Sequence, residues 1–375
     1  MRRVILKDIA QAMGVSIALI SCALNDKPDG YGNVSIKPEM RQKIKDKAKE
    51  MGYRPNRQAR ALKVGSSKLI GIVTPHSENP LVSHRILGIT GEILHRGFDY
   101  IIQQISSTDY ERFKKALELF MDYGVQGIIL MSSGFEFDSS KKVQGISQYE
   151  IPIVEMSSRS HGEYPSVMPD FYMAAFQLAS TVIRNGRKNI AFVGMDEASM
   201  TVSVRERLSG VKDACAQFEG ISLNCYSTPI EYRSLSEIKQ GYHSTIDIIS
   251  RGKPDFIFYT NDSLALGGAH ALDQSGINVP EDICICGVDG LEVVSVAHPP
   301  ITTIEQPVME LALKTVEVLF DMIEDRKPIT KEYYRIPCRL IFRESTGVLT
   351  EIPQYDNWIS EMNANKTEVV HGQES

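Results

Sequence analysis

The sequence predicts a small all-α headpiece followed by two α/β lobes, each a doubly wound parallel sheet, with a cleft between the lobes. Three observations lead to this architecture. Residues 1–63 combine helical apolar spacing with 14 Lys and Arg against six Asp and Glu. From Leu69 onward, short β-rich runs alternate with amphipathic stretches of about a dozen residues, as in βαβ units. One open twisted sheet of all the expected strands would be large, which favours two lobes.

The headpiece begins with two short helices joined by a tight turn. The first is expected at Lys7–Met13 and should end at Gly14, because glycine adopts the positive φ of such a turn at little cost. Ser16 then lies in the N-cap position of a second helix that continues to Leu24. Two helices joined in this way form the helix-turn-helix unit, whose second helix fits the major groove of DNA.

A third helix is expected to start at Pro38, a residue tolerated in the first turn, and to stop at Gly52. Its apolar face would consist of Met40, Ile44, Ala48 and Met51. The segment 26–33 before it is rich in turn-forming residues and should be a loop. The joint Gly65-Ser66-Ser67 marks the expected boundary between the headpiece and the lobes.

Strands and helices alternate through the α/β part. The expected strands are Leu69–Val73, Tyr100–Gln104, Gly127–Leu130, Ile153–Met156, Ile190–Val193, Leu223–Ser227, Phe256–Tyr259 and Ile283–Cys286. The expected helices are Ser83–Arg96, Tyr110–Tyr123, Tyr172–Arg184, Val204–Phe218, Ser236–Ser250, Ser263–Ser275 and Pro307–Glu324. Ligands of such folds bind beyond the carboxyl ends of the strands, so the cleft between the lobes is the expected binding place.

Charge and hydropathy narrow the class of function. The chain of 375 residues has a formal net charge of −6. Residues 1–63, with 14 basic and six acidic residues, are nevertheless near +8, which suggests a polyanionic partner for this segment. On charge alone, a solvated basic helix is an equal explanation. No apolar run approaches the roughly 18 residues of a membrane span, and no signal-peptide core follows Arg3, so we expect a cytoplasmic protein.

Local signatures of catalysis and of metal binding are absent from the sequence. It contains no GxxxxGK[ST], GxGxxG, HExxH or GxSxG motif, and its eight His include no i,i+4 pair. The six Cys lack the spacing of a zinc site and the density of a disulfide-stapled chain. We therefore expect no enzymatic activity, no metal and no cofactor.

Several stretches, in order along the chain, resemble one protein family. They are KDIAQAMGVS, SCALN, GYRPNRQARALK, IGIVTPHSENP, RERLSG, YTNDSLALGGAHALDQSGINVPEDICICGVDG, PPITTIEQP and RLIFRESTG, all within residues 5–347. Together they are similar to the LacI family of bacterial transcription regulators. The resemblance implies a helix-turn-helix headpiece at 1–52, a hinge helix or linker at 53–64 and a two-lobed effector-binding and dimerisation domain at 65–347. That domain would be similar to type I periplasmic binding proteins, and a polar tail would occupy 348–375.

The resemblance also implies a function. A homodimer would bind a pseudo-palindromic double-stranded DNA operator as a repressor, and a small-molecule effector in the cleft, a sugar or sugar derivative, would control the operator affinity. An activator of the same fold and a solute-binding protein without gene control are the alternatives, with an enzyme that uses the cleft as a more distant one. No membrane partner is expected.

In the headpiece, the resemblance assigns DNA contacts to the second helix. The residues at these positions are Ser16, Ile17, Ala18, Leu19, Ser21, Cys22 and Asn25. Ile17, Ala18 and Leu19 have no groups for bidentate hydrogen bonds to bases, so they would contact thymine methyls at most. The alternative is that these side chains only pack the headpiece.

In the hinge, the resemblance assigns DNA contacts to Asn56, Ala59 and Leu62. A short helix here would lie in the minor groove, with Leu62 as a wedge that kinks the duplex between two base steps. A helix this short is unstable alone in water. We therefore expect it to form only when DNA and the lobes stabilise it. An exposed linker is the alternative.

The resemblance also assigns contacts with the effector to six residues, which are His76, Asn79, Ser157, Arg207, Asn261 and Asp289. The Arg207 guanidinium suits neighbouring hydroxyls or a carboxylate, and Asn261 and Asp289 suit sugar hydroxyls. Asn261 could instead cap the following helix, and Asp289 could be a turn residue. Ser157 stands where many sugar-responsive members carry Asp, and Asp170 is expected to cap a helix rather than to contact the ligand.

Overall fold

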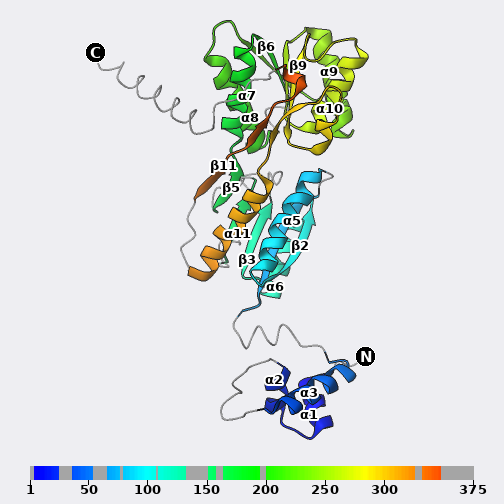
Figure 1. Cartoon of the computed structure of the whole chain (residues 1–375), viewed down its shortest axis with the longest axis vertical. Coiled ribbons are helices and arrows are strands. Elements are labelled where there is room, and N and C mark those ends of the chain that lie inside the picture. Colours follow the sequence, from blue (N-terminus) through cyan, green and yellow to red (C-terminus); the bar gives the residue numbers. More distant parts are fainter. Residues whose placement is uncertain are drawn as a thin grey trace, which may run out of the picture. The chain divides into compact units, whose positions relative to one another are not determined.

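The computed structural model describes residues 4–24, 36–53, 66–76, 79–106, 109–131, 151–157, 164–194, 200–325 and 332–347. The chain forms two compact units, Met1–Ser67 and Lys68–Ser375 (Figure 1). In this part of the chain, no single helix is long and apolar enough to cross a membrane. One bent pair, Leu6–Met13 with Ile17–Leu24, passes the same test only when its two helices are taken together.

The small unit is a bundle of α1 (Leu6–Met13), α2 (Ile17–Leu24) and α3 (Pro38–Glu50). Gly14 ends α1 with a φ of 65°, as predicted, and the Ser16 hydroxyl caps α2 by accepting a hydrogen bond of 3.2 Å from the Leu19 N–H. The core of the bundle is small and apolar, and its buried residues are Ile9, Ala10, Ile20, Ala23, Ile44 and Ala48. The expected apolar face of α3 is only partly confirmed, because Met40 is 37% exposed.

The large unit has two lobes, each built on a six-stranded sheet. In the N-lobe the strand order is β11-β5-β4-β3-β1-β2, and every pairing is parallel. Its strands are β1 (Leu69–Pro75), β2 (Asp99–Ile105), β3 (Gly127–Met131), β4 (Ile153–Met156), β5 (Ser166–Pro169) and β11 (Tyr333–Ile336). Its helices are α5 (Pro80–His95), α6 (Tyr110–Tyr123) and α11 (Val308–Asp325).

The C-lobe repeats this order as β12-β10-β9-β8-β6-β7, except that the edge strand β12 is antiparallel to β10. Its strands are β6 (Asn189–Gly194), β7 (Ser222–Ser227), β8 (Phe256–Tyr259), β9 (Cys284–Asp289), β10 (Thr302–Glu305) and β12 (Arg339–Ile341). Its helices are α7 (Phe171–Arg184), α8 (Val202–Ala216), α9 (Glu237–Arg251) and α10 (Asp262–Gln274), with short turns η3 (Ile230–Tyr232), η4 (Glu292–Ser295) and η5 (Glu344–Thr346).

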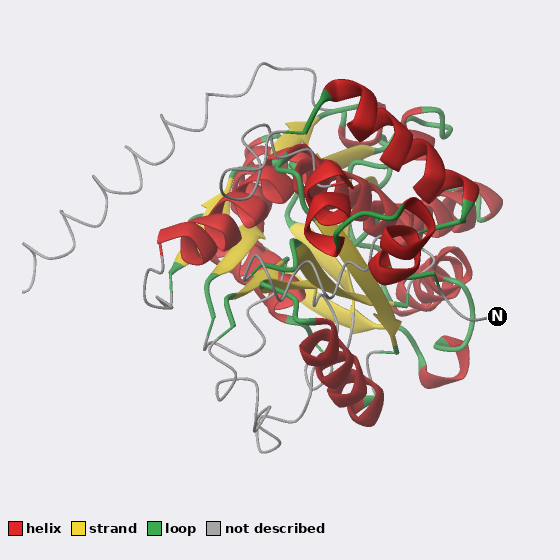
Figure 2. Ribbon diagram, turned by 90° about the horizontal axis from the view of Figure 1, so that it is seen from below, coloured by secondary structure: helices red, strands yellow, loops and turns green. Residues whose placement is uncertain are grey.

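Helices cover both faces of each sheet (Figure 2). In the N-lobe, α5 and α11 pack on one face, while Phe113 and Phe120 of α6 lie in the apolar cluster of the other. In the C-lobe, Phe176 of α7 and Val211 of α8 pack on one face, and α9 and α10 cover the other. Burial of these faces is the main apolar contribution to stability.

The described chain passes between the lobes at three places. The links lie between β5 and α7, between β10 and α11, and between β11 and β12. Each lobe is therefore assembled from segments far apart in the sequence, and three short links join the two lobes.

All eight predicted strands of the lobes are present, but β5, β10, β11 and β12 were not predicted. The reason is physical: each has only three or four residues, and sequences such as TTIE or YYRI show neither a long apolar run nor clear alternation. Helix α5 also starts earlier than predicted, at Pro80, because Asn79 caps it by accepting a hydrogen bond from the Leu81 N–H.

Candidate functional site

In the helical unit, the N-terminal end of α2 is the exposed part of that helix. Ser16, Ile17 and Ala18 are exposed, with Ile17 at 47%, whereas Leu19 and Ser21 are half-buried. The alternative that Ile17 and Ala18 only pack the headpiece does not fit this exposure. An exposed aliphatic surface of this kind suits the methyl groups of thymine in the major groove.

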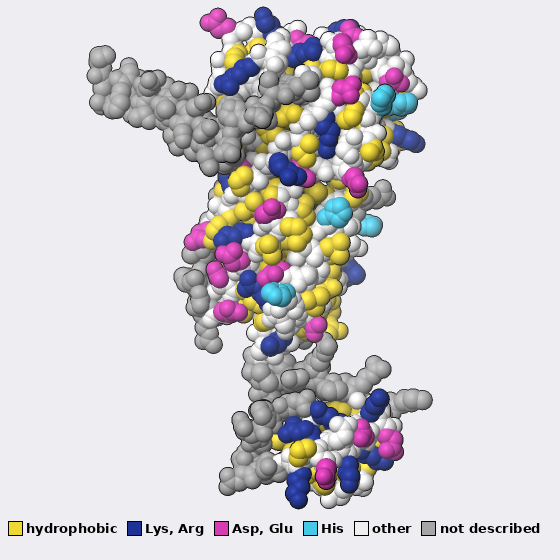
Figure 3. Space-filling view, in the orientation of Figure 1, with side chains coloured by type: hydrophobic (Ala, Val, Ile, Leu, Met, Phe, Trp, Pro, Cys, Tyr) yellow, Lys and Arg dark blue, Asp and Glu magenta, His cyan; other side chains and the backbone are white. Residues whose placement is uncertain are grey.

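Cys22 differs from the expectation, because its side chain is only 6% exposed. So buried a thiol offers little surface to base edges. Asn25 and the hinge residues Asn56, Ala59 and Leu62 lie outside the described residues. Basic side chains on α3, including the exposed Lys43 and Lys49, add positive charge to this unit (Figure 3), and such charge suits phosphate groups.

In the large unit, a cavity of about 370 Å³ opens at the carboxyl ends of β6, β7 and β8. This is where ligands of doubly wound sheets bind. All the residues that line it belong to the C-lobe, and they are Gly194, Val204, Arg207, Thr228, Arg233, Glu237, Gln240, Thr260, Asn261 and Leu264. Of the six residues predicted for the effector, Arg207 and Asn261 lie in this lining.

Arg207 is the central group of the cavity. Its side chain comes from the second turn of α8, is 7% exposed, and donates a hydrogen bond of 2.6 Å to the Thr260 carbonyl. The guanidinium lies 3.9 Å from the centroid of the Phe171 ring, which fixes its plane. Among the described residues its Nε has no hydrogen-bond partner, and burial lowers its pKa. The cavity therefore contains a buried, oriented donor that a ligand could satisfy.

Asn261 has two roles at the start of α10. Its Oδ1 accepts a hydrogen bond of 2.8 Å from the Leu264 N–H, so the predicted capping alternative is confirmed. Its Nδ2 also donates to Glu237 at 3.1 Å on the cavity wall. Partial burial in the cavity, with the negative charge of Asp289 nearby, raises the pKa of Glu237. Asn261 and Glu237 thus offer a hydrogen-bond donor and an acceptor side by side, a combination that suits neighbouring hydroxyl groups of a ligand.

Asp289 lies at the end of β9, with a φ of 128°, and does not line the cavity. Its carboxylate accepts hydrogen bonds from Asn79 Nδ2 at 3.2 Å and from Gln306 Nε2 at 2.7 Å. Gln306 in turn accepts from Arg85 of α5 at 2.5 Å. Asp289 thus joins the C-lobe to the N-lobe and to one of the links, and burial raises its pKa.

The remaining predicted positions lie on the N-lobe side of the cleft or near it. Ser157 follows β4 with a φ of 61° and is 2% exposed, and its Oγ has no partner among the described residues. Its carbonyl accepts a hydrogen bond of 3.4 Å from the Ser203 hydroxyl of α8. His76 is exposed after β1. Asp170 caps α7 by accepting from the Met173 N–H at 3.2 Å, as predicted.

Sequence reasoning missed most of the cavity wall, because only Arg207 and Asn261 of its ten lining residues were predicted. Thr228 and Thr260 directly follow β7 and β8, so the rule that ligands bind at the carboxyl ends of strands could have found them. Arg233, Glu237 and Gln240 come from the turn after η3 and the first turns of α9, where no local pattern signals them.

Comparison with known proteins agrees with this arrangement. Residues 5–56 match the family model of bacterial regulatory proteins of the lacI family, and residues 179–346 match the model of a periplasmic binding protein-like domain. The chain belongs to the LacI family. It is 29% identical to the HTH-type transcriptional regulator RegA of Clostridium saccharobutylicum over 91% of this chain and 98% of that protein. It is 28% identical to catabolite control protein A of Priestia megaterium, over 90% and 98%.

Solved structures of LacI proteins show the same fold. The Lac repressor dimer bound to operator and the anti-inducer ONPF superposes with a TM-score of 0.77 at 23% identity, covering 92% of this chain and 99% of that chain. A LacI regulator from Enterococcus faecium with bound ribose superposes with a TM-score of 0.63 at 25% identity, covering 74% and 98%. Three curated relatives, RegA, PurR of Mannheimia succiniciproducens and DegA of Bacillus subtilis, are named as regulators or repressors of transcription.

Proposed function

We propose that this LacI protein is a transcriptional repressor whose affinity for a DNA operator is controlled by a saccharide or saccharide derivative bound at Arg207. The observation that carries the proposal is the C-lobe cavity, which is lined by the buried Arg207, whose Nε has no partner among the described residues, and by the hydrogen-bonded pair Glu237 and Asn261. Neighbouring hydroxyls are the ligand groups that match such a set of donors and acceptors. The ligands named in the cellobiose-bound CelR and ribose-bound neighbours support this class.

The DNA-binding part of the proposal assigns the major groove to α2 and the phosphates to the basic side chains around it. Ser16, Ile17 and Ala18 form its exposed edge, and Leu19 and Ser21 lie beside it. The hinge positions Asn56, Ala59 and Leu62 keep their proposed place in the minor groove. Because α2 offers little hydrogen bonding to bases, the deformability of the operator centre should carry much of the specificity.

A homodimer completes the proposed function, since a pseudo-palindromic operator needs two headpieces. Exposed apolar side chains are available on neighbouring helices of the N-lobe: Leu87 (69%) and Leu94 (51%) on α5, and Met309 (55%) and Leu313 (45%) on α11. A subunit interface on this surface would bury them. We place the protein in the cytoplasm, where its DNA lies, and assign it no catalytic step.

The test is a binding selection on genomic fragments. Purified full-length protein is expected to retain specific fragments at low salt, and ribose, cellobiose or a related saccharide is expected to change that retention. The variant Leu62→Ala should weaken fragment binding severely and leave saccharide binding unchanged. Equal retention of all fragments, with and without saccharides, would refute the proposal.

A further inference from the structure

Helix α8 carries two neighbouring residues that face different parts of the molecule. Arg207 faces the C-lobe cavity and donates to the Thr260 carbonyl. Glu206, one position earlier, faces β11 of the N-lobe and accepts hydrogen bonds from Tyr333 and Arg335. A rigid helix therefore joins the cavity of one lobe to a contact with the other lobe.

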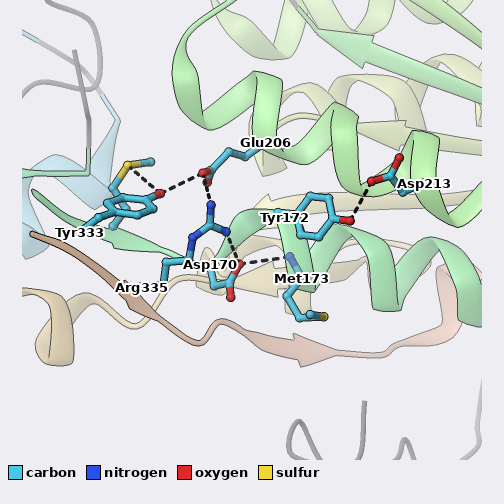
Figure 4. A network of polar contacts seen from close by, with 8 residues as sticks. Asp170, Tyr172, Met173, Glu206, Asp213, Tyr333 and Arg335 are labelled. Atoms are coloured by element: carbon cyan, nitrogen blue, oxygen red, sulfur yellow. Dashed lines mark hydrogen bonds and ion pairs between the residues drawn. The ribbon is translucent and has the colours of Figure 1, made fainter. Parts of the chain in front are cut away.

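The contact of Glu206 with the N-lobe is compact (Figure 4). Tyr333 Oη and Arg335 Nη2 both lie 2.9 Å from Glu206 Oε1. The two residues share one face of β11 because they are two positions apart in the strand. Arg335 Nη1 also lies 3.0 Å from Asp170 Oδ1, on the link between β5 and α7. We call Glu206, Tyr333 and Arg335 the interlobe latch.

The latch is well shielded from water on the Glu206 side. The Glu206 side chain is 15% exposed and that of Asp170 7%, whereas Arg335 is 40% exposed. Glu206 Oε2 is buried without a hydrogen-bond partner among the described residues, and burial raises the pKa of this carboxyl. If the lobes move apart, the hydrogen bonds from Tyr333 and Arg335 to Glu206 Oε1 break together, and water must replace both. The latch therefore favours two distinct arrangements of the lobes, with these bonds formed or broken, over a continuous range.

We propose that Glu206 is a positioning residue, which through the interlobe latch couples occupancy of the Arg207 cavity to the relative position of the two lobes. The inference rests on the proposed function, because it takes the cavity to be the effector site. A ligand that engages Arg207 shifts α8, and α8 carries Glu206 with it. The effector and the latch therefore act on the same equilibrium between lobe arrangements.

The chain offers a matched control inside one lobe. Tyr172 of α7 donates a hydrogen bond of 2.7 Å to Asp213 of α8, and both helices belong to the C-lobe (Figure 4). Tyr172→Phe and Tyr333→Phe each remove one tyrosine–carboxylate hydrogen bond made to α8. Only Tyr333→Phe removes a bond between lobes, so the pair separates coupling from general stability.

The first measurement needs no ligand. Spin labels attached to non-canonical residues at the exposed positions Glu118 (α6) and Asp273 (α10) report the distance between the lobes in the full-length protein, diluted with unlabelled protein. We expect the wild type and Tyr172→Phe to share one distance distribution, and Tyr333→Phe and Glu206→Gln to shift or broaden it. The same distribution in all four proteins would overturn the proposal. Tyr333→Phe decides the question alone if Glu206→Gln does not fold.

The second measurement titrates ribose and cellobiose into each protein by calorimetry, and the melting temperature of each protein is recorded separately. Both latch variants should need about fivefold more saccharide for half-saturation, whereas Tyr172→Phe should lower the melting temperature without moving this concentration. An unchanged concentration in the latch variants contradicts the coupling. If neither saccharide binds to the wild type, the proposed ligand class is wrong for these sugars, and the label distances still decide on the latch.

Discussion

The two lobes share one strand order and differ in what they offer at their surfaces. The C-lobe holds a polar cavity at the ends of β6, β7 and β8, with Arg207 buried in its wall. The N-lobe contributes no residue to that cavity, but it exposes apolar side chains on α5 and α11. In our proposal, the same topology thus serves ligand binding in the C-lobe and subunit contact in the N-lobe. The side chains, rather than the topology, decide the role of each lobe.

Among the described residues, each lobe has one buried arginine, and the two arginines have different surroundings. Arg207 lines the cavity, whereas Arg85 of α5 bonds to Gln306 on the link between β10 and α11. Burial lowers the pKa of Arg85 to about 10. The comparison predicts that Arg207 contributes to ligand binding, whereas Arg85 stabilises the contact between the lobes.

The largest expected effect is that of Arg207→Lys. Lysine keeps the charge but loses the planar set of donors, so saccharide affinity should fall about tenfold to a hundredfold. Calorimetric titration measures this loss, and DNA binding without saccharide should stay intact. Arg85→Lys is the control, and it should lower the melting temperature more than the affinity. Equal losses of affinity in both variants would contradict the division of roles between the lobes.

The next effect concerns the apolar surface of the N-lobe. The double variant Leu87→Glu/Leu313→Glu places two charges on α5 and α11 and should weaken dimerisation by at least about tenfold, as measured by sedimentation equilibrium. Tyr123→Glu is the matched control, because Tyr123 is 47% exposed on α6, which covers the opposite face of the sheet. A dimer that survives the double variant and dissociates in the control would place the interface elsewhere.

The smallest effect comes from a buried carboxyl of the C-lobe. Burial, with the negative charge of Asp289 nearby, raises the pKa of Asp262 to about 7 from the usual 3.8. The folded state therefore holds this proton to higher pH than the unfolded state does. Its contribution to stability is present at low pH and is lost as the pH rises from about 4 through 7.

Asp262→Asn should remove this loss. The free energy of unfolding of the wild type should fall by at least about 1 kcal/mol more than that of the variant between pH 4.5 and 7.5, as followed by urea denaturation. Asp247→Asn, which removes an ion pair with Arg251 on the surface of α9, serves as the control. Parallel pH profiles for the wild type and Asp262→Asn would show that Asp262 is ionised in the folded protein.

Much of the fold was predictable because its signals are local. Apolar runs marked the central strands, and Gly14, Ser16 and Pro38 marked helix ends through φ preferences and capping. The short edge strands β11 and β12 were missed because distant pairing, rather than their own three or four residues, keeps them in the sheets. Short strands of this kind have no reliable signature in a single sequence.

The site was predictable where it follows strand ends and not where it depends on tertiary contacts. The sequence indicated Arg207 and Asn261, and both line the cavity. Asp289 was expected beside them, but Asn79 and Gln306 hold it in a contact between the lobes. No local pattern reveals that a carboxylate will meet a partner 210 residues away in the chain.

The three passages of the chain between the lobes have a consequence for synthesis on the ribosome. The N-lobe begins with Leu69, yet its sheet lacks an edge strand until Ile336 has been made. By then every C-lobe strand except β12 has already been synthesised. The N-lobe therefore starts first but is completed only near the end of synthesis. A nascent chain that stalls before α11 exposes the apolar face of the N-lobe sheet that α11 covers in the folded protein, and chaperones can bind such a surface.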